Sequence, residues 1–195
     1  GTAMNIRHPL RVVAAVLATA VLLLGALIGM ELSATALPPQ TGDLPTADDA
    51  TVARGAYLAR AGNCVACHTA RGGEPYAGGH PIRTPYGTLV GGNLTPDRET
   101  GLGNWSPQAF RRALHEGISR DGRLLYPAFP YAHTTRLSDA DADALYAYLR
   151  SVPAVARANE PHDLRFPYNT PVALAMWRLL NFEPGRQMED ATRSA

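Results

Sequence analysis

The chain has no lysine and only two cysteines among its 195 residues. All 18 basic side chains are arginines, 17 acidic residues nearly balance them, and the formal net charge is +1. This balance argues against a polycationic nucleic-acid-binding surface. The chain also lacks a Gly-x-Ser-x-Gly motif and a phosphate-binding loop, so it shows no catalytic apparatus of those kinds. Its length allows one domain of ordinary size with extensions.

Both cysteines lie in one short motif, Cys64-Val65-Ala66-Cys67-His68. This order of two thiols and an imidazole is the one that covalent haem attachment requires. Two thioethers hold the haem, and the histidine is the proximal iron ligand. A redox dithiol, a plain disulfide and half of a zinc site remain as alternatives, although a zinc site would have to recruit distant histidines. The motif therefore predicts one haem c bound by Cys64, Cys67 and His68.

An uncharged apolar stretch of 19 residues, 12–30, follows Arg7 and Arg11 and precedes Glu31. As a helix it would be about 28 Å long at ~1.5 Å per residue, close to the ~30 Å hydrocarbon core of a bilayer. The arginines predict that residues 1–11 are cytoplasmic and that the rest of the chain lies outside. A cleaved signal peptide is the alternative, because Ala34-Thr35-Ala36 fits a cleavage site. We favour a retained anchor, since the apolar run exceeds the roughly 7–15 residues of a signal peptide.

The remaining chain reads as a proline-containing linker over 31–47 and a helical domain over 48–153. Helices are predicted over 48–61, from the N-cap Ser106 and Pro107 to Gly117, and from the N-cap Ser138 to a stop before Pro153. Residues 72–103 form a long Gly/Pro-rich passage without a strong period, which a haem is large enough to fill. The pattern favours an all-α domain, followed by an extension over 154–195 that packs on the domain or on a partner.

Residues 48–182 resemble a haem module of the cytochrome c subunits of membrane-bound bacterial dehydrogenases. The matching stretches include Arg54-Gly55-Ala56-Tyr57-Leu58, Gly92-Asn93-Leu94-Thr95-Pro96-Asp97, Leu125-Tyr126-Pro127, Leu137-Ser138-Asp139 and Ala144-Leu145-Tyr146-Ala147-Tyr148-Leu149. The resemblance implies a class I-like cytochrome c domain that is not itself an enzyme. It also implies electron transfer from a dehydrogenase catalytic subunit to a quinone or a terminal oxidase, at the periplasmic side of the inner membrane. Such modules often occur three in series, and this chain matches one.

One position departs from the family pattern. Many of these modules ligate iron with a methionine in the Pro-x-x-Pro-Tyr loop, where this chain has Phe129. Relatives with phenylalanine there resemble this chain in having a histidine at the position of His133. We therefore expect His133 to be the distal iron ligand, with Met176 and the weaker Met188 as alternatives. An open sixth position, suited to a haem enzyme or a ligand-binding protein, is the remaining possibility.

Three aromatic residues are expected to line the haem pocket. Trp105 and Tyr126 combine an apolar body with a donor that could reach a haem propionate, although either could equally be a core aromatic. Phe129, between two prolines, would form an apolar lid over the ring.

Overall fold

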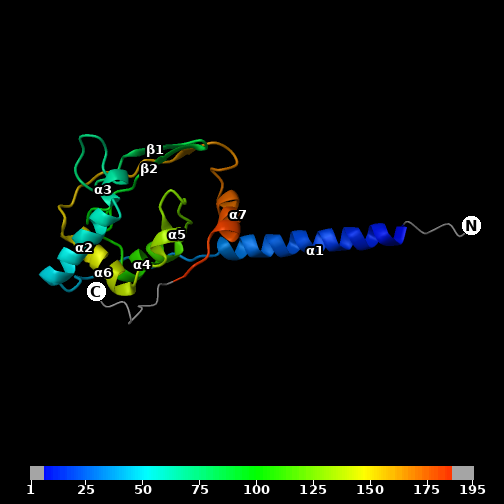
Figure 1. Cartoon of the computed structure of the whole chain (residues 1–195), viewed down its shortest axis with the longest axis horizontal. Helices are drawn as coiled ribbons and strands as arrows, with labels where there is room; N and C mark the ends of the chain where they lie inside the picture. Colours follow the sequence, from blue (N-terminus) through cyan, green and yellow to red (C-terminus); the bar gives the residue numbers. More distant parts are fainter. Residues whose placement is uncertain (1–6, 186–195) are drawn as a thin grey trace, which may run out of the picture.

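The computed structural model describes residues 7–185 of the chain, and Figure 1 shows their arrangement. In chain order the elements are α1 (Arg7–Glu31), α2 (Asp49–Ala61), α3 (Cys64–Cys67), β1 (Pro81–Thr84), β2 (Gly87–Val90), α4 (Pro107–Glu116), α5 (Tyr131–Thr134), α6 (Asp139–Ser151), β3 (Asp163–Leu164) and α7 (Pro171–Asn181).

Three helices begin where the capping residues predict. The side chains of Asp48, Ser106 and Ser138 accept hydrogen bonds from the first-turn amides of α2, α4 and α6. Each of these bonds satisfies a donor that has no partner within the helix. At the other end of α4, Gly117 adopts a left-handed conformation with φ 63°, which glycine tolerates without steric cost. The three predicted helices are therefore confirmed.

The central core lies between α2, α4 and α6. Its buried residues are Ala59, Tyr76, Leu102, Phe110, Leu114, Ala142, Leu145, Tyr146 and Leu149. Helices α2 and α6 cross closely at Gly55, where an added Cβ would lie 1.9 Å from the Ala144 carbonyl oxygen. Only a glycine permits this approach, which fixes the direction in which α2 leads into the haem motif.

The expectation of an all-α fold is corrected by a small antiparallel sheet in the order β1-β2-β3. Strands β1 and β2 form a hairpin that pairs Ile82 with Leu89 and closes through Pro85 and Tyr86. Strand β3 then pairs Thr88 with Asp163, so the C-terminal extension returns to the domain. Four-residue strands between glycines and prolines carry too little alternation to stand out in the sequence. The fold is helix-rich, and it has one small sheet with two strands inside the Gly/Pro-rich passage and the third in the C-terminal extension.

Helix α1 projects away from the domain (Figure 1). Its residues Leu10–Glu31 are long and apolar enough to cross a membrane, and they are exposed along most of their length. The following linker lies against the domain, because the Leu37 amide donates to the Arg120 carbonyl at 2.8 Å and the Gln40 amide donates to the Asn104 carbonyl at 2.9 Å. The expectation of an apolar helix over 12–30 is confirmed as a candidate membrane span.

Candidate functional site

The single turn of α3 carries the haem motif. Asn63, with φ 51°, turns the chain between α2 and α3, and the His68 amide closes the turn on the Cys64 carbonyl at 3.1 Å. Residues three and four apart share one face of such a turn, so Cys64, Cys67 and His68 can reach one ligand. The Cys64 thiol is half-buried against the central core, and burial raises its pKa. Cys67 is exposed, and both thiols are free of a disulfide.

The orientation of His68 is fixed by the backbone. Its Nδ1 lies 2.7 Å from the Gly92 carbonyl oxygen, which can only accept, so Nδ1 carries the proton and Nε2 presents a lone pair. Burial lowers the pKa of the imidazole, although the Gly92 contact opposes this shift. A neutral imidazole held through its second nitrogen is the form that ligates metals, because the hydrogen bond sets the tautomer and the ring direction.

Two glycine-containing loops hold the haem motif in place. The Gly78 amide donates to the His68 carbonyl at 2.8 Å, and the Ala70 amide donates back to the Gly78 carbonyl at 3.0 Å. A Cβ at Gly91 would lie 1.7 Å from the Cys67 carbonyl oxygen. Position 91 therefore has to be glycine for the loop that carries Gly92 to reach the motif.

Asn93, the residue after Gly92, fixes the position of this loop. Its buried side-chain amide donates to the carbonyls of Val155 (2.8 Å) and Arg157 (3.2 Å) and to the Thr100 hydroxyl (3.0 Å). Its oxygen accepts from the Thr95 amide and hydroxyl at 2.9 and 2.7 Å. Asn93 thus joins the loop beside His68 to the chain after α6. In the sequence it stands out only as part of a family stretch, since its partners lie far away in the chain.

These residues fit a covalently bound haem. Two free thiols, one half-buried and one exposed, lie on the same turn as a neutral imidazole whose Nε2 is available. Cys64 and Cys67 would hold the haem and His68 would ligate its iron, which supplies reversible one-electron chemistry. Between residues 7 and 185, no group of three or more His, Cys, Asp or Glu side chains could hold a metal ion, so the described chain gives no support to a zinc site.

The other predicted pocket residues separate into two groups. Trp105 and Phe129 pack against the central core, as Cys64 does. Tyr126 instead joins a second cluster, which contains Ile28, Ile118, Leu124, Tyr126, Leu174 and Ala175. Its hydroxyl donates to the Tyr168 carbonyl at 3.1 Å, so that donor already has a partner in the C-terminal extension.

The predicted distal ligands lie on two different helices. His133 is exposed on the short helix α5, which directly follows the Phe129 loop. Met176 lies on α7 with 39% of its surface exposed, and Met188 lies outside the described residues. His133 and Met176 are therefore both accessible, and His133 is the one that shares a segment with the loop predicted to cover the ring.

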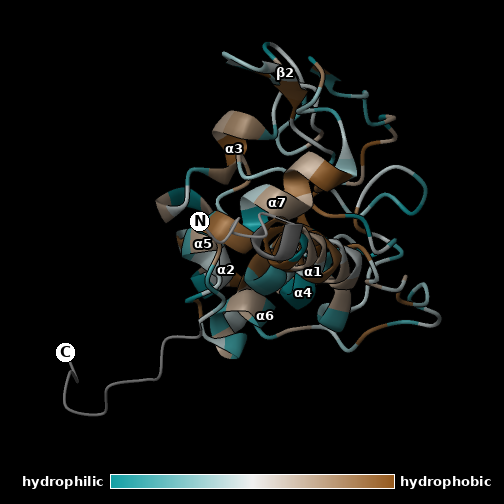
Figure 2. Ribbon diagram, turned by 90° about the vertical axis from the view of Figure 1, so that its right-hand side faces the viewer, coloured by the Kyte–Doolittle hydropathy of each residue, from teal (hydrophilic) through white to brown (hydrophobic). Residues whose placement is uncertain are grey.

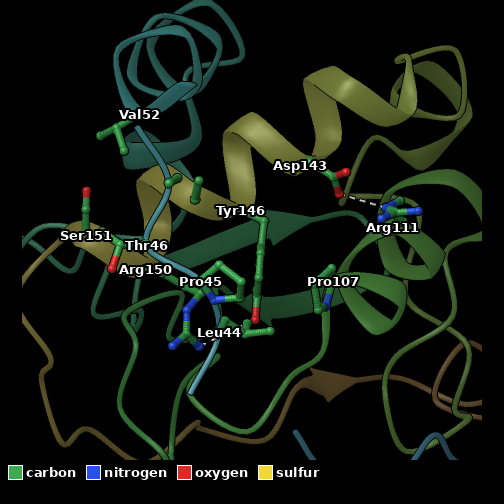
Figure 3. A pocket seen from close by; sticks show the side chains of 12 residues that line it. Leu44, Pro45, Thr46, Val52, Pro107, Arg111, Asp143, Tyr146, Arg150 and Ser151 are labelled. Carbon is green, nitrogen blue, oxygen red and sulfur yellow. Dashed lines mark hydrogen bonds and ion pairs between the residues drawn. The ribbon is translucent and has the colours of Figure 1, made fainter. Parts of the chain in front are cut away.

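A separate hollow of about 380 Å³ lies where the linker crosses α2, α4 and α6 (Figure 3). Leu44 and Pro45 form its linker side, and the ion pair between Arg111 and Asp143, at 2.7 Å, borders it. It contains neither the thiols nor His68, so it is distinct from the haem motif.

The Cytochrome c family model matches residues 52–153. The chain belongs to the cytochrome c family, which agrees with the covalent haem c and the electron-transfer function predicted from the sequence.

Comparison with individual proteins defines a narrower group within this family. The chain is 46% identical over 178 residues to a subunit of the nicotinate dehydrogenase of Pseudomonas putida, covering 88% of this chain and 15% of that protein. It is 49% identical over 133 residues to the gluconate 2-dehydrogenase cytochrome c subunit of Pantoea cypripedii, covering 68% and 30%. It is 46% identical over 135 residues to the cytochrome c subunit of the quinone-dependent alcohol dehydrogenase of Gluconobacter oxydans, covering 69% and 28%. The chain thus spans less than a third of each of these relatives. The predicted resemblance to dehydrogenase cytochrome c subunits is confirmed.

Proposed function

We propose that the chain is a membrane-anchored electron-transfer module with a single haem c. It accepts electrons from a dehydrogenase catalytic subunit and passes them to a quinone or a terminal oxidase. The observation that carries this proposal is the Nδ1 contact of His68 with Gly92. That contact leaves Nε2 ready for iron on the same turn as two free thiols.

The proposed location follows from α1 and from the relatives. Helix α1 has the length of a bilayer span, and Arg7 and Arg11 favour a cytoplasmic N-terminus. The haem domain then lies on the periplasmic side of a bacterial inner membrane. Dehydrogenase names recur among the relatives, which supports a dehydrogenase as the electron donor.

Redox titration of the purified full chain, combined with co-purification from solubilised membranes, tests this function. We expect one reversible one-electron transition and a co-purifying dehydrogenase subunit that reduces the haem when its substrate is added. A haem that remains oxidised in that complex would refute the proposed role.

For the distal side we propose ligation of the iron by His133. Support comes from Phe129, whose side chain cannot ligate iron, and from the exposed position of His133 on the helix that follows it. Two imidazoles would give a lower potential than the pair of His and Met found in Met-ligated relatives. The alternative is an open sixth position.

Near-infrared spectra and carbon monoxide binding separate these possibilities. We expect the oxidised protein to lack the Met-to-iron charge-transfer band, and the reduced protein to bind carbon monoxide only after His133→Ala. A charge-transfer band that persists in His133→Ala would assign the ligand to a methionine. Carbon monoxide binding by the unmodified chain would instead indicate an open site.

A further inference from the structure

The solvent-facing side of α7 is apolar. Val172, Met176, Leu179 and Leu180 follow one another at helical spacing and are all exposed, Leu180 to 79%. The one charged side chain of this helix, Arg178, is only 5% exposed. An ordinary surface helix buries one apolar face and exposes its charges, whereas α7 buries Leu174, Ala175 and its charge and leaves a second apolar face exposed. An exposed apolar face of this kind indicates a contact outside the described chain.

Buried contacts fix α7 to the end of α1. Arg178 Nε lies 2.6 Å from the Glu31 carboxylate, and Nη1 donates to the Glu116 carbonyl at 2.7 Å. Ile28 of α1 packs with Leu174 and Ala175 of α7. Glu31 is the last residue of the candidate membrane span. Helix α7 therefore lies at the level where the chain would leave the bilayer.

The direction of α7 also suits a membrane surface. Figure 1 shows α7 running across the end of α1 rather than alongside it, on the side of the domain from which α1 projects. Figure 2 looks at that side and shows apolar colours on both helices. If α1 crosses a bilayer, α7 lies roughly in the plane of its surface, as amphipathic interfacial helices do.

Exposed aromatic residues precede α7 in the chain. Phe166 is 81% exposed, and the half-exposed rings of Tyr86 and Tyr168 contact each other at a tilt of 45°, with their centroids 4.3 Å apart. Aromatic side chains are enriched where a protein meets the interface of a bilayer. In the described part of the chain, the exposed charged residues nearest to α7 in sequence are Arg165 before it and Glu183 after it, so neither sign dominates there.

We propose that the exposed face of α7, with Phe166 and Tyr168, inserts into the lipid interface beside α1. The inference rests on the proposed membrane anchor and adds a second membrane contact to it. Two contacts, joined by the partly buried Arg178–Glu31 pair, would hold the haem domain in one orientation above the bilayer.

Thiol accessibility tests this contact in the full haem-loaded chain. The thioethers occupy both native cysteines, so a cysteine introduced by Leu180→Cys or Val172→Cys is the single reactive thiol. The matched control is Ala53→Cys, at an exposed position of α2 on the far side of the domain from α7. Each variant is incorporated at one chain per nanodisc of phosphatidylcholine and phosphatidylglycerol, and a charged maleimide is added.

We expect the α7 thiols to react at least tenfold more slowly than the control thiol, and all three to react alike after denaturation. Equal rates in the nanodisc would place the face in water and overturn the inference while leaving the anchor intact. Labelling of the α7 thiols that is fast at one chain per disc and slow at two chains per disc would assign the face to a contact with a second copy instead. Failure of the chain to enter nanodiscs would overturn the anchor itself, and the inference with it.

Discussion

At the scale of single residues, the site depends on a backbone carbonyl that must point at His68. Gly92 supplies the oxygen, Gly91 lets the loop approach Cys67, and Asn93 ties that loop to the chain after α6. Asn93 is a positioning residue, because it acts on the imidazole only through the Gly92 carbonyl.

Replacing Asn93 tests this chain of contacts. Asn93→Ala removes five side-chain hydrogen bonds and leaves the buried Thr95 amide without its acceptor, so we expect a loss of roughly 2–4 kcal/mol in the free energy of unfolding. The midpoint potential should also rise, because a weaker Nδ1 hydrogen bond makes His68 a poorer electron donor. Thermal unfolding and a redox titration measure the two effects.

The control for this variant is Asn104→Ala. Asn104 makes one side-chain bond, to the Arg98 carbonyl at 2.7 Å, in an exposed turn, so both quantities should change little. A destabilised Asn93→Ala protein with an unchanged potential would show that Asn93 supports the fold but not the ligand.

At the scale of elements, α2 delivers the haem motif and α6 holds α2 in place. The close crossing at Gly55 predicts that Gly55→Ala forces the helices apart, at a cost of about 1–3 kcal/mol. The thermal midpoint followed by circular dichroism should fall by about 2–12 °C, at 2–4 °C per kcal/mol. Gly29→Ala is the matched control, a helical glycine with no atom within 4 Å of the added Cβ. An unchanged midpoint for Gly55→Ala would contradict the crossing.

The helices could be predicted from the sequence because their signals are local. Asp48, Ser106 and Ser138 each cap a helix within three residues of themselves, and Cys64, Cys67 and His68 form their motif within five. The hairpin could not be predicted from the sequence, because β1 and β2 have four residues each and lie among glycines and prolines.

Contacts between distant segments could not be predicted from the sequence either. Asn93 bonds with Val155 across 62 positions and Arg178 with Glu31 across 147, and no periodicity encodes such pairs. The exposed face of α7 is a further case, because an apolar run does not say which of its sides is covered.

At the scale of the whole molecule, Arg178 links the anchor to the domain. Besides its bonds to Glu31 and Glu116, its guanidinium lies over the rings of Tyr131 and Phe182, at 5.4 and 4.8 Å from their centroids. Tyr131 is the first residue of α5, so the same side chain touches the helix that carries His133.

Removing the charge of Arg178 should weaken the contact between the anchor helix α1 and the domain. Arg178→Met leaves the partly buried Glu31 carboxylate without its partner, and we expect a loss of roughly 2–3 kcal/mol in the free energy of unfolding, because an unpaired charge away from water is unfavourable. Arg165→Met, at an exposed position, is the control and should change stability little. Thermal unfolding in nanodiscs compares the two, and equal midpoints would mean that Arg178 is not the link.

The central claim is that Cys64 and Cys67 together hold one haem c. Intact mass spectrometry of the denatured full chain, produced in cells with a cytochrome c maturation system, tests it most directly. The account predicts a single species with the mass of the chain plus one haem, unchanged by reducing agent and absent from the Cys64→Ser, Cys67→Ser double variant. A bare chain, or a chain lighter by two hydrogens that reducing agent restores, would contradict it.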